Sequence, residues 1–140
     1  MDSKASARWE GGLKDGQGHV STESGALDAN YSFKQRFEGA PGTNPEELIG
    51  AAHAGCFSMA LSMILGEKGY TAESIDTQAR VTLSQGSSGF DISKIHLEVE
   101  AQVSGADEAA FKEAAETAKA NCPVSKVLNA DITMTAKLKG

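Results

Sequence analysis

The chain has 140 residues, of which 40% are hydrophobic and 23% are charged, and its formal net charge is −6. A chain of this length forms one domain that buries roughly two-thirds of its unfolded surface, so it needs no disulfide for stability. The acidic balance offers no basic patch to nucleic acid and disfavours anionic membrane surfaces. We therefore expect a single domain over residues 1–140 that binds neither nucleic acid nor membrane.

Three strands are expected at the start of the chain, over residues 6–10, 19–23 and 31–38. The first two are separated by the glycine-rich segment GGLKDGQG, which is typical of a turn. In the third, aromatic and polar side chains alternate, which is the pattern of a half-buried strand. This alternation places Arg36 on the polar face of the strand, together with Lys34.

A long helix is expected to begin at Pro45 and to end between residues 66 and 69. Asn44 can act as its N-cap, with Pro45 in the first helical position and Glu47 in the third. Residues 48–65 carry no formal charge and reach the lower limit of length for a membrane span. The small and polar residues in that run, and the lack of a basic flank, argue against a span. We expect a buried central helix that is covered in part by a second subunit.

The C-terminal half predicts two more strands, two helices and a final strand. Residues 75–84 and 90–103 read as a hairpin, and residues 107–120 as an amphipathic helix. Pro123 permits a short helix that ends near residue 128, and residues 132–139 alternate as a strand. The resulting order, βββ-α-ββ-α-α-β, is that of an α+β domain.

The chain contains two cysteines, Cys56 and Cys122. Its start, MDSKASARWEGG, has no apolar signal segment, so we expect a cytoplasmic protein, in which a disulfide is usually transient, catalytic or sensory. Buried cysteines also serve as small hydrophobic residues, and that interpretation stays open at this point. Cys122 precedes Pro123 at an expected helix start, where free amides stabilise a thiolate. Cys56 lies inside an apolar helix, so it needs a nearby cation to become reactive.

Two motifs contain these cysteines, NPEELIGAAHAGCFSMAL around Cys56 and NCPVSKVLNA around Cys122. Both resemble the signature regions of the OsmC/Ohr family, and the osmotically inducible OsmC branch fits best. The similarity extends from ARWEGGLKDGQGHVSTESG through YSFKQRFEG to the terminal strand. It implies an OsmC-like fold, an intertwined homodimer with active sites at the subunit interface, and a thiol-dependent peroxidase that reduces organic hydroperoxides during oxidative or osmotic stress.

By position, the resemblance makes Cys56 the peroxidatic cysteine and Cys122 the resolving cysteine, with Arg36 and Glu46 completing the site. Arg36 would stabilise the Cys56 thiolate, and Glu46 would hold the guanidinium in a bidentate pair. Cys56 would become a sulfenic acid, which Cys122 captures as a disulfide. An external dithiol must then reduce that disulfide, and the family favours a lipoylated protein as its source. Without the motifs, Arg36 would be interpreted as a solvated charge and Glu46 as a charge in the first turn of a helix.

Helix geometry adds a constraint on this site. Ten residues separate Glu46 from Cys56, which corresponds to about 15 Å of rise, so Glu46 cannot touch the Cys56 of its own helix. Either Arg36 bridges from a neighbouring strand or part of the pair comes from the second chain. His53 shares a face with Cys56 and could act as a base, but with Arg36 available we favour a packing role for it. The histidines and cysteines form no zinc pattern, and no cofactor is expected.

The residues expected near Cys56 are apolar and suit an alkyl or aryl group. They are Phe33, Phe37, Ile49, Phe57, Met59, Met63 and Leu65. Organic hydroperoxides are therefore expected to react faster than hydrogen peroxide. An alternative function is a stress protein without turnover, which senses oxidants through its thiols or binds a small apolar ligand. The acidic surface and the lack of a DNA-binding element argue against a direct transcriptional sensor.

Overall fold

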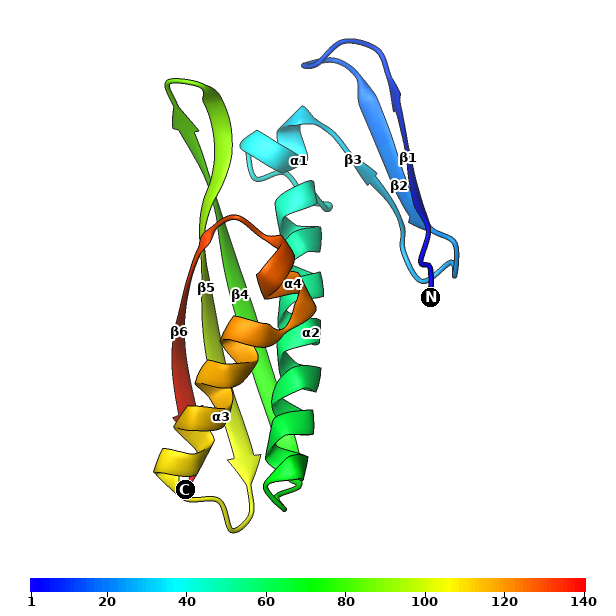
Figure 1. The fold of residues 1–140 in the computed structure, drawn as a ribbon. Helices are drawn as coiled ribbons and strands as arrows, with labels where there is room; N and C mark the ends of the chain where they lie inside the picture. Colours follow the sequence, from blue (N-terminus) through cyan, green and yellow to red (C-terminus); the bar gives the residue numbers. More distant parts are fainter. The chain divides into compact units, whose positions relative to one another are not determined.

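The structure is a computed structural model that describes residues 1–140 (Figure 1). Its elements are β1 (Ala5–Glu10), β2 (Gln17–Thr22), β3 (Asp28–Tyr31), α1 (Phe33–Phe37), α2 (Pro45–Glu67), β4 (Ala72–Gly86), β5 (Gly89–Val103), α3 (Glu108–Asn121), α4 (Pro123–Val127) and β6 (Asp131–Leu138). The chain forms two compact units, Met1–Leu48 and Ile49–Gly140. The predicted α+β class is confirmed.

The first unit contains an antiparallel sheet in the order β1-β2-β3. Gly18 on β2 pairs with Trp9 on one side and with Tyr31 on the other, and the two aromatic rings lie 5.6 Å apart between centroids. A Cβ atom at Gly18 would lie 2.7 Å from Trp9 Cε3, closer than van der Waals contact permits. Glycine is therefore required here because the aromatic rings cover its backbone.

The prediction of a strand over residues 31–38 is wrong beyond Tyr31. The strand β3 ends at Tyr31, and the short helix α1 follows from Phe33 to Phe37 with Ser32 in the N-cap position. Phe33 and Phe37 are four residues apart, so they are neighbours on a helix, and their rings lie 4.8 Å apart. The aromatic spacing that suggested a strand is equally compatible with this helical pair.

The second unit contains a sheet in the order β4-β5-β6, in which β4 and β5 are antiparallel and β5 and β6 are parallel. The expected hairpin is present, because Gly86 pairs with Gly89 at its tip. Alternate residues of β5 from Ile95 to Val103 are buried in the core, which also contains residues of α2 and α3. Figure 1 shows α3 and α4 lying alongside the sheet, next to α2.

The helix α2 begins as predicted, because the Glu47 N–H donates to Asn44 Oδ1 over 2.8 Å. Within the second unit it packs against β4. A Cβ atom at Gly50 would lie 3.4 Å from Val81 Cγ2, and Ser58 Oγ lies 2.7 Å from Thr77 Oγ1. Small and hydroxyl side chains therefore hold the helix close to the sheet.

Only one face of α2 is buried in the chain. Phe57, Leu61 and Leu65 recur every four residues and are fully buried, whereas Met59 and Met63 are 78% and 61% exposed. One side of α2 is therefore left uncovered by its own chain, and cover of that side by a second subunit stays a prediction. By length and composition alone α2 could cross a membrane, but core helices of soluble proteins share those properties.

Candidate functional site

Cys56 lies near the middle of α2 and is a half-buried, free thiol. Burial raises the pKa of Cys56, a hydrogen bond from the Val124 backbone lowers it, and the neighbouring thiol of Cys122 raises it again. The net effect is a raised pKa, and none of the groups that shift it is a cation. The structure therefore places the two thiols side by side, in surroundings that disfavour the Cys56 thiolate.

Cys122 is almost fully buried at the junction of two helices. It follows the last residue of α3 and is the N-cap of α4, with Pro123 in the first helical position, as predicted. Its sulfur accepts the backbone N–H of Ser125 over 3.3 Å, and the Ser125 hydroxyl lies 3.1 Å from the same sulfur. Ser125, the third residue after Cys122, thus orients the Cys122 thiol with its hydroxyl and its backbone N–H.

His53 is fully buried one turn before Cys56 on α2. Its Nε2 atom lies 2.7 Å from Ser125 Oγ, whereas its Nδ1 atom is buried and has no hydrogen-bond partner. Burial lowers the pKa of His53 below its ordinary value, which favours the neutral imidazole. The sequence reasoning assigned His53 to packing and did not select Ser125. The signal available for Ser125 was its position three residues after the N-cap Cys122.

Arg36 and Glu46 form the bidentate pair that was expected. Arg36 Nη2 donates to Glu46 Oε1 over 2.7 Å, and Arg36 Nε lies 3.1 and 3.3 Å from Oε1 and Oε2. Glu46 is buried in the first turn of α2, and the guanidinium also lies 5.5 Å from the centre of the Phe37 ring. Arg36 comes from α1 and not from a strand, so its predicted place on a polar strand face is wrong.

The structure brings the four predicted residues together as two pairs. Arg36 and Glu46 form an ion pair in the unit Met1–Leu48, and the free thiols of Cys56 and Cys122 lie near each other in the unit Ile49–Gly140. Each pair has the contacts that its proposed chemistry requires, a held guanidinium in one and two adjacent thiols in the other.

The apolar residues expected around Cys56 have different locations. Phe57 and Leu65 are fully buried in the core, so they cannot line a surface open to a substrate. Met59 and Met63 are exposed and, because they lie three and seven residues after Cys56, they occupy the same side of the helix. The exposed apolar surface beside the thiol therefore consists of methionine side chains.

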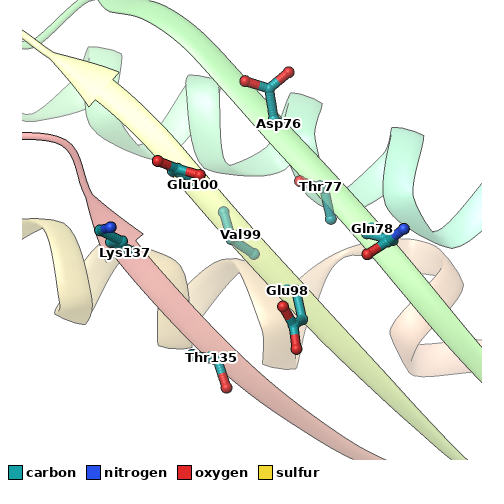
Figure 2. A pocket seen from close by; sticks show the side chains of 8 residues that line it. All are labelled: Asp76, Thr77, Gln78, Glu98, Val99, Glu100, Thr135 and Lys137. Carbon is teal, nitrogen blue, oxygen red and sulfur yellow. The ribbon is translucent and has the colours of Figure 1, made fainter.

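A hollow of about 390 Å³ lies on the sheet of the second unit (Figure 2). It is lined by Asp76, Thr77, Gln78, Glu98, Val99, Glu100, Thr135 and Lys137, and Figure 2 shows the helices behind the strands that carry them. Its lining contains neither cysteine, so it is not the thiol site. No group of three or more His, Cys, Asp or Glu residues is arranged to hold a metal ion.

A family model described as OsmC-like protein matches residues 37–137. The peroxiredoxin OsmC of Escherichia coli (strain K12) is 57% identical over 140 residues, which cover 99% of this chain and 98% of the relative. The organic hydroperoxide resistance protein OhrB of Bacillus subtilis (strain 168) is 29% identical over 124 residues, 87% of this chain and 89% of the relative. A crystal structure of OhrB of Bacillus subtilis covers 99% of this chain and 98% of its own, with a TM-score of 0.74 and 28% identity.

Proposed function

This chain is a peroxidase that belongs to the OsmC-like protein family, and we propose that it reduces organic hydroperoxides to alcohols through Cys56 and Cys122. The observation that carries the proposal is the proximity of two reduced thiols, one half-buried and the other buried, which is close enough for Cys122 to raise the pKa of Cys56. The proposed role is defence against oxidative and osmotic stress. Residues 1–140 act in it as one functional domain, since the alignment with the peroxiredoxin relative spans 99% of the chain.

The proposed cycle has three steps. The Cys56 thiolate attacks the terminal peroxide oxygen, the O–O bond breaks, and the alcohol leaves with the second oxygen and a proton while Cys56 becomes a sulfenic acid. The Cys122 sulfur then attacks the Cys56 sulfur, so a disulfide forms and water leaves. An external dithiol reduces the disulfide by exchange, and a lipoylated protein is the proposed source. A reducing compartment suits this last step, so we propose a cytoplasmic location.

Activation of Cys56 requires a cation, because burial raises the pKa of its thiol. Arg36 is the proposed cation. Glu46 fixes its guanidinium in three hydrogen bonds from Nε and Nη2, and the remaining N–H groups can stabilise both the thiolate and the oxygen that leaves in the first step. The catalytic set proposed for this peroxidase is therefore Cys56, Cys122, Arg36 and Glu46.

The active form is proposed to be a homodimer. The exposed side of α2 carries the large apolar side chains of Met59 and Met63 near Cys56, and a second copy of the chain would cover them. Covering this side would also create an apolar, water-poor environment for an alkyl or aryl hydroperoxide. We expect cumene hydroperoxide to give a higher kcat/KM than hydrogen peroxide in a coupled dithiol assay. Equal or reversed values would contradict an apolar substrate site.

The assignment of residues to chains can be tested by mixing inactive subunits. Cys56→Ser lacks the nucleophile and Arg36→Ala lacks the cation, so each homodimer is expected to be inactive with cumene hydroperoxide and dihydrolipoamide. If Arg36 serves the Cys56 of the partner, the mixed dimer contains one complete site and recovers activity. If both act within one chain, mixing restores nothing, because each chain then lacks one of the two groups.

A second function, a sensor that reacts once without turnover, would use the same two neighbouring thiols. The two functions differ in stoichiometry. With excess dithiol, the peroxidase consumes many equivalents of hydroperoxide for each chain, whereas a sensor stops after about one equivalent. A single consumption assay therefore separates them, and we expect continued turnover.

A further inference from the structure

A continuous line of buried polar contacts runs from His53 to the two cysteines. His53 Nε2 lies 2.7 Å from Ser125 Oγ, and Ser125 Oγ lies 3.1 Å from Cys122 Sγ. The Cys122 thiol in turn lies close enough to Cys56 to raise the pKa of that thiol. His53 and Cys122 are almost completely enclosed, and Ser125 is 8% exposed. The hydroxyl of Ser125 is therefore the one polar group between the imidazole and the Cys122 sulfur that can pass a proton.

We propose that Ser125 and His53 form a proton relay that deprotonates Cys122 as it attacks the oxidised Cys56, an inference that rests on the proposed function. Ser125 is a catalytic residue in this step, because its hydroxyl touches the reacting sulfur. His53 acts through Ser125 and positions it. The relay serves the second step of the cycle only, so it is distinct from the Arg36–Glu46 pair that serves the first.

The proposed step balances in atoms and charge. The Cys122 S–H proton passes to Ser125 Oγ while the Ser125 hydroxyl proton passes to His53 Nε2. The Cys122 sulfur attacks the Cys56 sulfur, the S–S bond forms, and the S–O bond of the sulfenic acid breaks. Hydroxide leaves and takes the proton of the Ser125 hydroxyl while the imidazolium returns its proton to Ser125 Oγ, so the products are a disulfide and one water molecule.

Two further observations support proton transfer from Cys122 toward His53. The Ser125 backbone N–H donates to Cys122 Sγ over 3.3 Å, which holds the sulfur against the hydroxyl and stabilises negative charge on it. His53 must be neutral to accept a proton, and its burial favours that form. The relay requires Nε2 to accept from the Ser125 hydroxyl 2.7 Å away, which places the hydrogen of the neutral imidazole on the buried Nδ1.

An ordinary core residue would not carry this unpaired nitrogen. Buried polar atoms are almost always hydrogen-bonded, and leaving one unpaired is unfavourable. An apolar side chain at position 53 would fill the same space between α2 and α4 without that penalty. The unpaired Nδ1 is therefore better explained by a function for Nε2 than by packing.

A single-turnover experiment separates the two chemical steps. The reduced protein is mixed with one equivalent of cumene hydroperoxide and quenched at successive times with acid or with a sulfenic-acid trap. Intact mass then gives the rate of peroxide consumption at Cys56 and the rate of disulfide closure with Cys122. The variants are Ser125→Ala, Ser125→Thr and His53→Gln. Ser58→Ala is the control, since Ser58 is also hydrogen-bonded to another side chain but does not touch a sulfur.

We expect Ser125→Ala to slow disulfide closure on the order of 10²-fold and to leave peroxide consumption nearly unchanged. Ser125→Thr retains the hydroxyl and restores closure, whereas His53→Gln keeps a hydrogen-bond acceptor but cannot take a proton, so closure stays slow. The control variant changes neither rate.

Three results would overturn the relay. Closure could be as fast in Ser125→Ala as in the wild type, the two rates could fall together in both Ser125→Ala and Ser125→Thr, or His53→Gln could close normally. Failure of the proposed function is distinguishable from these outcomes, because the wild-type protein would then consume no hydroperoxide at Cys56.

Discussion

At the residue scale, the reactivity of Cys56 depends on two opposing effects. Burial raises the pKa of its thiol, whereas a cation held nearby would lower it. The Arg36 guanidinium is held for such a role by two hydrogen-bonding nitrogens on one buried carboxylate. An Arg36→Lys substitution would keep the positive charge but lose the planar guanidinium that binds the carboxylate through two nitrogens and so fixes its own orientation.

The first prediction concerns the pH dependence of Cys56. In a Cys122→Ser background, Arg36→Ala removes the cation, so the thiolate forms only at higher pH and the midpoint of iodoacetamide alkylation moves upward. Reaction with hydroperoxide at neutral pH falls on the order of 10²-fold. Arg8→Ala, at an exposed ion pair in β1, is the control. An unchanged midpoint in Arg36→Ala would show that Arg36 does not act on Cys56.

The second prediction concerns His53 and stability. Burial lowers its pKa in the folded state, so between the folded and unfolded values the unfolded chain binds more protons. The stabilisation is complete above the unfolded value of about 6.5 and is lost as the pH falls through that value toward the folded one. The Tm of the wild type should therefore fall more steeply between about pH 7.5 and pH 5 than that of His53→Gln. Parallel pH profiles would contradict a buried neutral imidazole.

The pKa of His19 is shifted in the opposite direction, but this shift does not affect the comparison of Tm between the wild type and His53→Gln. A hydrogen bond with Asn30 raises the pKa of His19, so its contribution is present at low pH and is lost as the pH rises through the folded value. Both proteins contain His19, and its effect cancels in the difference between them. The difference in slope therefore reports on position 53.

At the element scale, local signals predicted the helix ends and the hairpin. Asn44 followed by Pro45 marks the start of α2, Cys122 followed by Pro123 marks the start of α4, and both caps are present in the structure. These features were predictable because they depend on residues within one turn of each other. The family resemblance supplied the pairing of Arg36 with Glu46, which spacing alone could not assign.

Two features were not predictable from local patterns. The aromatic spacing of Phe33 and Phe37 fits a strand and a helix equally well, and only packing decides between them. The contact between His53 and Ser125 joins residues 72 positions apart, so no periodicity could indicate it. A side of α2 left for a second subunit was expected, but its identity was not predictable, because composition does not tell which face of an apolar helix the same chain covers.

The third prediction concerns that exposed side of α2. Met63→Glu places a charge on a surface that a second copy of the chain is proposed to cover, so it should weaken dimerisation and shift the mass measured by light scattering toward that of the monomer. The helix itself should persist, because glutamate favours helices and the side chain is exposed in the single chain. Ala109→Glu on the exposed side of α3 is the control. A mutant that remains dimeric would exclude this face as the interface.

At the scale of the whole molecule, each unit carries one part of the proposed chemistry. Met1–Leu48 supplies a held guanidinium, and Ile49–Gly140 supplies two adjacent thiols with a buried polar relay behind the second. The proposed dimer gives these parts a shared apolar environment. The proposed peroxidase cycle depends on one chemical event, the closure of a disulfide between Cys56 and Cys122.

The most direct test of that event is the intact mass of the protein under non-reducing conditions after one equivalent of cumene hydroperoxide. We predict a single chain that is lighter by two hydrogen atoms. After digestion, Cys56 and Cys122 should lie in one disulfide-linked peptide. A dithiol should restore the original mass. An unchanged mass, a covalent dimer, or stable oxidation of Cys56 while Cys122 remains a free thiol would contradict this prediction.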